Sequence, residues 1–98
     1  MTSELFIFAR FHAKEGRESA VASALREVIG PTRQELGCLA IDAFESIGDS
    51  RLFYIQSRWA DEAAFDLHAG LAHTVRFVEK MRAMIDHDLE VTRTRPLA

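Results

Sequence analysis

Hydrophobic positions near the start of the chain alternate with a two-residue period, as they do in a β-strand. One face of the stretch "ELFIFARFHA" (residues 4–13) carries Leu5, Ile7, Ala9 and Phe11. Phe6 and Phe8 fall on the other face, which is just as apolar. A strand with two apolar faces is expected to be covered on both sides. We therefore predict a strand with helices against one face and a second cover against the other.

The next stretch, "KEGRESAVASALREVIGPTRQELG" (residues 14–37), has apolar residues at helical spacing. They are Val21, Leu25, Val28 and Ile29. Pro31 has no amide hydrogen to donate and its ring clashes with the preceding turn, so Gly30-Pro31 is predicted to stop or kink the helix. Because proline is well tolerated in a first turn, "PTRQEL" is predicted to restart as a short helical segment ending at Gly37.

Two strand-like runs follow, "CLAIDAFESI" (residues 38–47) and "RLFYIQSRWA" (residues 51–60). Gly48 and Asp49 lie between them and suit a tight connection, so we predict an antiparallel hairpin. One face of its second strand carries Phe53, Ile55, Ser57 and Trp59.

The last third of the chain combines a helical region with a final strand. Asp61 is a good N-cap for residues 62–86, and Gly70 is predicted to divide this region into a short and a longer helix. The longer helix has an apolar stripe of Val75, Val78, Met81 and Ile85, widened by Phe77 and Met84. In residues 87–95, "HDLEVTRTR", apolar and polar residues alternate, which predicts a strand with one solvated face.

The predicted order is strand, helix, strand, strand, helix, strand. This order is typical of the ferredoxin-like βαββαβ fold, an α+β fold in which both helices cover one face of a four-stranded antiparallel sheet. At 98 residues the chain is expected to form a single domain, 1–98. The second sheet face is predicted to be apolar and uncovered, so we expect a homodimer formed by sheet-to-sheet packing.

Composition narrows the choice of partners and compartments. The formal charge of -3 makes a nucleic-acid partner unexpected, because no net positive field attracts phosphates. A single cysteine, Cys38, excludes an internal disulfide and is read as a small buried residue. The opening residues "MTSELFIFARF" lack the features of a signal peptide, and their apolar run is much shorter than the ~20 residues that span a bilayer. A cytoplasmic protein without membrane contact is expected.

The four histidines do not show a recognised metal-binding spacing. His68 and His73 are five residues apart, which on a continuous helix would place them about 140° from each other. We therefore expect no metal. Neither "GRE" nor "IGDS" has the glycine-rich spacing that a phosphate or dinucleotide needs, so no flavin or nicotinamide site is expected either.

Trp59, His68 and His73 are the candidate functional residues. The strand that ends at Trp59 leads into the helical region with both histidines, so all three could line a space between sheet and helices. A neutral histidine there could take a proton from a phenol. The alternative is a core tryptophan with two half-buried helix histidines, and the residues alone favour this alternative.

A resemblance to a known family changes this balance. Three stretches carry it: "FARFHAKEGRE", "PTRQELGCLAID" and "SRWADEAAFDLHAGLAHTVRF", the last with one tryptophan and two histidines five residues apart. On these stretches the chain resembles the antibiotic biosynthesis monooxygenase domain family. This family includes small quinol monooxygenases and belongs to the dimeric α+β barrel superfamily.

The resemblance implies a homodimer of ferredoxin-like subunits, each with a pocket between sheet and helices. It implies oxidation of a quinol or polycyclic phenol to a quinone by O₂ without metal, flavin or other cofactor. His68 or His73 would remove the phenolic proton, and an arginine, Arg58, could stabilise the phenolate, although strand alternation turns it away from Trp59. The aromatic walls for the substrate would be Trp59, Phe11, Phe65 and Phe77.

Two other functions stay open. The same scaffold with the same histidine pair also occurs in proteins that isomerise or bind small signal molecules, because a fold does not determine a reaction. One alternative is therefore a non-catalytic dimer that binds a small ligand. The other is an isomerase or detoxifying enzyme that acts on a small oxygenated metabolite.

Overall fold

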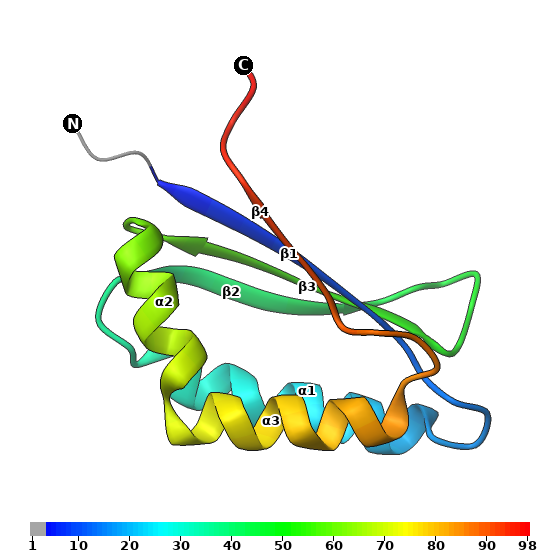
Figure 1. Ribbon diagram of the computed structural model, residues 1–98. Coiled ribbons are helices and arrows are strands. Elements are labelled where there is room, and N and C mark those ends of the chain that lie inside the picture. The colour runs from blue at the N-terminus through cyan, green and yellow to red at the C-terminus, as the bar shows by residue number, and fades with distance from the viewer. Residues whose placement is uncertain (1–3) are drawn as a thin grey trace.

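A computed structural model describes residues 4–98 of the chain, and the first three residues of the predicted 1–98 domain lie outside the described residues (Figure 1). The elements in chain order are β1 (Leu5–His12), α1 (Glu18–Arg33), β2 (Cys38–Glu45), β3 (Leu52–Trp59), α2 (Glu62–Gly70), α3 (Ala72–Met84) and β4 (Glu90–Thr94). The strands form one antiparallel sheet in the order β2-β3-β1-β4. The predicted ferredoxin-like α+β fold is confirmed. No helix within residues 4–98 is long and apolar enough to cross a membrane.

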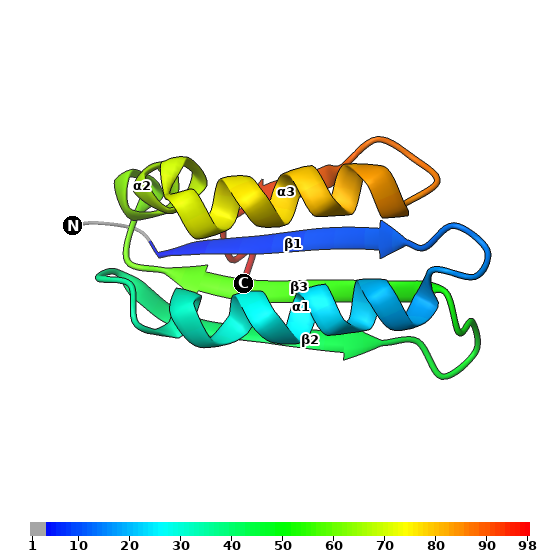
Figure 2. The same cartoon turned by 90° about the horizontal axis from the view of Figure 1, so that it is seen from below.

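The central strand β1 separates a buried face from an open one. Its residues Leu5, Ile7, Ala9 and Phe11 are buried, as predicted from their two-residue period. Helices α1 and α3 run side by side beneath this face (Figure 2). The core between helices and sheet is formed mainly by Phe11, Val21, Leu25, Val28, Phe53, Ile55 and Met81.

No element among residues 4–98 covers the opposite face of the sheet (Figure 1). Phe8 in β1 is 46% exposed there and Phe44 in β2 is 50% exposed. Tyr54 of β3 pairs with Phe44 across the strands and is also exposed. The two-faced pattern of the first strand therefore corresponds to a sheet with one packed face and one aromatic, solvent-facing face.

The prediction that Gly30-Pro31 separates two helical segments is wrong. Helix α1 continues through Pro31 and ends two residues later, at Arg33. Proline in this position removes a single hydrogen bond, the one to the carbonyl of Glu27, within the last turn of the helix. Beyond it the chain tightens into a turn, with the amide of Gln34 donating to the carbonyl of Pro31 at 3.2 Å. The cost of one lost bond is too small to end a helix whose apolar face is already packed.

The second helical region begins and divides as predicted. The Asp61 carboxylate accepts a hydrogen bond from the amide of Ala64 at 2.9 Å and caps α2. Gly70 ends α2, and Leu71 is extended before α3 starts. One member of the predicted stripe is wrong: Val75 is exposed, and Thr74 is buried in its place.

Candidate active site

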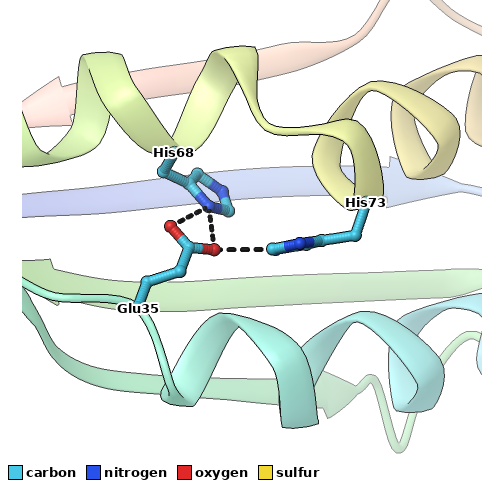
Figure 3. Close-up of side chains that lie close together, drawn as sticks. All are labelled: Glu35, His68 and His73. Atoms are coloured by element: carbon cyan, nitrogen blue, oxygen red, sulfur yellow. Dashed lines mark hydrogen bonds and ion pairs between the residues drawn. The ribbon is translucent and has the colours of Figure 1, made fainter.

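Three side chains meet at one end of the space between sheet and helices (Figure 3). The Glu35 carboxylate lies 2.8 Å from Nδ1 of His68 and 2.7 Å from Nε2 of His73. The side chains of Glu35 and His68 are 9% and 11% exposed, and that of His73 is 25% exposed. An ionised carboxylate can only accept hydrogen bonds, so both ring nitrogens that face it donate. We refer to Glu35, His68 and His73 as the Glu-His-His cluster.

Glu35 reaches the histidines from the short connection between α1 and β2. Its position depends on Gly37, whose φ of +91° is in the left-handed region that favours glycine. A Cβ atom added to Gly37 would lie 2.6 Å from Cβ of Ala64 in α2, so only glycine permits this close approach. The carbonyl of Gly37 also accepts from the amide of Ala60 at 2.9 Å. The sequence "ELG" thus supplies both the carboxylate and the contact that brings α2 to it.

His68 and His73 are not separated by the predicted angle of about 140°. That angle requires one continuous helix, whereas Leu71 is extended and joins two helices of different direction (Figure 1). The amide of Leu71 donates to the carbonyl of His68 at 3.2 Å, and its own carbonyl accepts from Val75 at 2.9 Å. This connection reorients the second histidine, so that both imidazoles point at one carboxylate.

Trp59 packs against His68 of the Glu-His-His cluster. It is completely buried, and its indole Nε1 donates to the hydroxyl of Ser57 at 3.0 Å. Its ring lies 4.7 Å from the ring of His68 and 5.5 Å from that of Phe65, measured between centroids. Trp59 is absent from the residues that line the adjacent cavity, so it acts on that cavity through His68 and Phe65. A rigid aromatic support of this kind restricts the rotation of His68.

A cavity of about 270 Å³ extends from His68 between the sheet and α3. Among its lining residues are three of the predicted aromatic residues, Phe11, Phe65 and Phe77. Phe11 and Phe77 contact each other edge to face, with centroids 5.8 Å apart. Within residues 4–98 no hydrogen-bond partner contacts Nε2 of His68. His73 instead borders a separate surface groove between α1 and α3.

The structure does not bring Arg58 to this cavity. Arg58 pairs with Phe6 in β1, on the open face of the sheet, and its guanidinium lies 3.6 Å from the carboxylate of Glu4. Sequence reasoning also gave no role to Glu35 or to Arg93. Arg93 joins β4 to α2 through Asp66, at 2.7 Å, and its guanidinium carbon lies 5.0 Å from the centroid of the Phe65 ring.

Sequence reasoning missed Glu35 because it lies 33 residues before His68, and no local pattern links positions that far apart. The available signal was its place in the "ELG" motif, directly before a strand whose first residue, Cys38, pairs with Trp59.

The Glu-His-His cluster has the chemistry to hold a divalent cation. One ligand atom from each residue lies within 4.8 Å of the others, and two imidazoles with one carboxylate suit several transition metals. In this structure the same three atoms satisfy one another by hydrogen bonds. Both a proton-sharing site and a metal site fit these distances, and an experiment on chelator-treated protein separates them.

The single cysteine does not have the surroundings of a nucleophile. Cys38 is partly buried at the start of β2, and burial raises the pKa of its thiol, with the nearby charge of Glu35 acting in the same direction. A raised pKa keeps the thiol protonated at neutral pH. This agrees with its interpretation as a small packing residue.

The antibiotic biosynthesis monooxygenase family matches residues 5–80 of the chain. A relative from Mycobacterium tuberculosis named "Putative monooxygenase Rv0793" is 31% identical over 97 residues, which cover 99% of this chain and 95% of the relative. "Putative monooxygenase YcnE" of Bacillus subtilis is 34% identical over 80 residues, covering 82% of this chain and 83% of the relative. The crystal structure of PA3566 from Pseudomonas aeruginosa has a TM-score of 0.91 at 32% identity and covers 100% of this chain and 98% of that chain. The chain belongs to the antibiotic biosynthesis monooxygenase family.

Proposed function

We propose that this protein is a monooxygenase that uses O₂ to oxidise a quinol or polycyclic phenol to a quinone, without a metal, flavin or other cofactor. Family membership and the names of its relatives support the monooxygenase class. One structural observation supports the proposed phenolic substrate. His68, which is hydrogen-bonded to the Glu35 carboxylate, lies at the end of an apolar, aromatic-lined cavity. This arrangement suits the removal of a proton from a planar phenol.

His68 is the proposed general base. Because its Nδ1 donates to Glu35, a neutral imidazole leaves the lone pair of Nε2 free to take the phenolic proton. The Glu35 carboxylate stabilises the imidazolium that forms and holds the ring in place. The Trp59 ring lies 4.7 Å from the His68 ring, tilted by 37°, and restricts the rotation of His68.

The remaining steps of the reaction need no oxidant other than O₂. The phenolate gives one electron to O₂, which produces a phenoxyl radical and superoxide. These recombine at a ring carbon, the peroxide takes a proton back from His68, and the O–O bond breaks. Water leaves with the hydrogen of that carbon, so one phenol and one O₂ give one quinone and one water. The protein provides an apolar, aromatic-lined cavity in which the radical pair stays together.

The proposal is tested by incubating chelator-treated protein with a panel of naphthols and quinols, with and without O₂. We expect quinone formation that needs O₂, and a loss of about 10²-fold or more in kcat for His68→Ala. His87→Ala, which removes a histidine in the connection beyond α3, is the matched control and should retain activity.

Three results would count against the proposal. Ligand-induced thermal stabilisation with no turnover would favour the ligand-binding alternative. Turnover that persists without O₂ would favour an isomerase or detoxifying enzyme. Activity that disappears with the chelator and returns with a divalent cation would assign the Glu-His-His cluster to a metal.

We also propose that a second copy of the chain covers the open face of the sheet. Phe8, Phe44 and Tyr54 form an exposed aromatic surface there, and sheet-to-sheet packing of two such surfaces would bury it. Analytical ultracentrifugation at micromolar concentration should show a dimer, and Phe8→Lys should shift the population to monomer. A wild-type protein that sediments only as a monomer would contradict this.

A further inference from the structure

The cavity beside His68 has a second group with specific chemistry. Of the lining residues within the described range 4–98, only His68 and Arg82 have titratable side chains. Nearly all other lining residues are apolar, and the three hydroxyl groups all have hydrogen-bond partners within the fold. The hydroxyl of Thr32 donates to a backbone carbonyl at 2.7 Å, and that of Ser57 accepts from an indole nitrogen at 3.0 Å. A ligand in this cavity would therefore meet two strongly polar groups.

The guanidinium of Arg82 has no carboxylate within 4.0 Å among residues 4–98. Asp86, two residues beyond the end of α3, is engaged by His12 at 2.7 Å. Arg93 in the neighbouring strand shows the contrast, because it pairs with both Glu62 and Asp66. Arg82 keeps its hydrogen-bond donors available at the rim of the cavity.

His68 and Arg82 stand at opposite ends of the cavity. Thr74 in the first turn of α3 lies 3.3 Å from Nδ1 of His68. Arg82 follows Thr74 by eight residues in the same helix, which corresponds to about 12 Å along the axis. On the sheet side the lining residues Ile7 and Phe11 of β1 are about 13 Å apart. The cavity is therefore a slot with a base at one end and a cation at the other.

We propose that Arg82 binds an acidic substituent of the substrate. The substrate class would then be an elongated aromatic phenol whose carboxylate lies at the end opposite the hydroxyl that His68 deprotonates. Arginine suits this role because its planar guanidinium binds a carboxylate through two parallel hydrogen bonds. The volume of about 270 Å³ is near the lower limit of small-molecule sites, which favours a two-ring core. This inference rests on the proposed function and specifies its substrate.

The experiment compares 6-hydroxy-2-naphthoate with its methyl ester, which differ in charge at the far end of the same ring system. Binding is measured by ligand fluorescence in the absence of O₂, so that no turnover takes place. Wild-type protein should bind the acid about tenfold more tightly than the ester, as expected for one charge-assisted pair. Arg82→Gln should remove this preference and leave the affinity for the ester unchanged.

Arg76→Gln is the matched control, because Arg76 is also in α3 and has no carboxylate within 4.0 Å among residues 4–98, but borders the groove between the helices instead. This variant should keep the preference for the acid. Equal binding of acid and ester by the wild type, no binding of either, or an equal loss in both variants would overturn the inference. A retained preference for the acid together with an absence of turnover would contradict the proposed function alone.

Discussion

Two clusters of histidine and carboxylate occupy opposite ends of the molecule and have inverse compositions. In the Glu-His-His cluster one carboxylate serves two histidines, and the Glu35 and His68 side chains are nearly buried. At the other end, His12 lies between two carboxylates, 2.7 Å from Asp86 and 3.0 Å from Asp49. Both aspartates are substantially exposed. We call His12, Asp49 and Asp86 the Asp-His-Asp cluster.

From this difference we infer that the Glu-His-His cluster serves the proposed chemistry and the Asp-His-Asp cluster serves stability. In the Asp-His-Asp cluster both ring nitrogens of His12 are engaged, so the ring cannot take a proton from a ligand. It links β1 to the β2–β3 connection and to the segment after α3, which is a structural role. In the Glu-His-His cluster Nε2 of His68 has no hydrogen-bond partner among residues 4–98, and His68 lines a cavity. A general base needs a nitrogen that is free to take a proton from a ligand, and His68 meets this requirement.

The largest expected effect comes from the shared carboxylate. Glu35→Gln should lower kcat by about 10²-fold, because the neutral amide cannot stabilise the imidazolium of His68. KM should stay near its wild-type value, since Glu35 does not line the cavity. Steady-state kinetics across pH checks both expectations. Glu27→Gln, which removes an exposed carboxylate of α1, is the control and should leave kcat unchanged.

A purely structural role for Glu35 would give a different result. In that case Glu35→Gln would lower the midpoint of thermal unfolding, and activity measured on the folded fraction would remain. A normal kcat in the variant would remove the functional distinction between the two clusters.

The second-largest expected effect concerns Gly37, where α2 approaches the connection that holds Glu35. Gly37→Ala should destabilise the fold by on the order of 3 kcal/mol, because it combines a strained φ with a Cβ contact to Ala64. Gly16 has a similar φ of +82° but open space around it, so Gly16→Ala should cost only about 1 kcal/mol, the strain alone. Urea unfolding of both variants gives the two values. Equal losses would mean that the approach of α2 to Gly37 does not matter.

The fold could be predicted from periodicity because each burial pattern is local. The alternation in residues 5–11 and the N-cap at Asp61 each involve neighbours in sequence, and the structure confirms both. The predicted break at Pro31 was wrong because the packed apolar face of α1 stabilises the helix beyond the proline. Val75 was misplaced because the start of α3 at Ala72 determines which residues face inward, and here Thr74 turns toward His68.

The candidate site could be predicted only in part. His68, Phe11, Phe65 and Phe77 lie around one cavity, and the sequence had named all four. Glu35 escaped notice because its contacts with the histidines span more than 30 residues and depend on the geometry of Gly37 and Leu71. Arg58 was carried over from chemistry alone, and strand alternation, which is reliable here, already indicated the opposite face. Long-range contacts, such as those between Glu35 in a connection and histidines in two helices, are the part that a single sequence does not determine.

The smallest expected effect is a change in the pH dependence of stability. Hydrogen bonds to Asp86 and Asp49 raise the pKa of His12 above its ordinary value of 6.5. A raised pKa means that its contribution is complete below pH 6.5 and is lost as the pH rises through the higher value. Hydrogen bonds from the backbone amide of Arg51 and from the His12 side chain lower the pKa of Asp49 below its ordinary value of 3.8. The hydrogen bond from His12 also lowers the pKa of Asp86 below this value. Their contribution is present above pH 3.8 and is lost in stronger acid, so the Asp-His-Asp cluster is most stabilising from about pH 4 to 6.5.

The unfolding midpoint of the wild type should therefore be higher at pH 5.5 than at pH 8.5, and His12→Gln should reduce this difference without changing kcat. An equal difference in both proteins would show that the pH dependence arises from another titrating group, and a fall in kcat would extend the functional role to this end of the molecule.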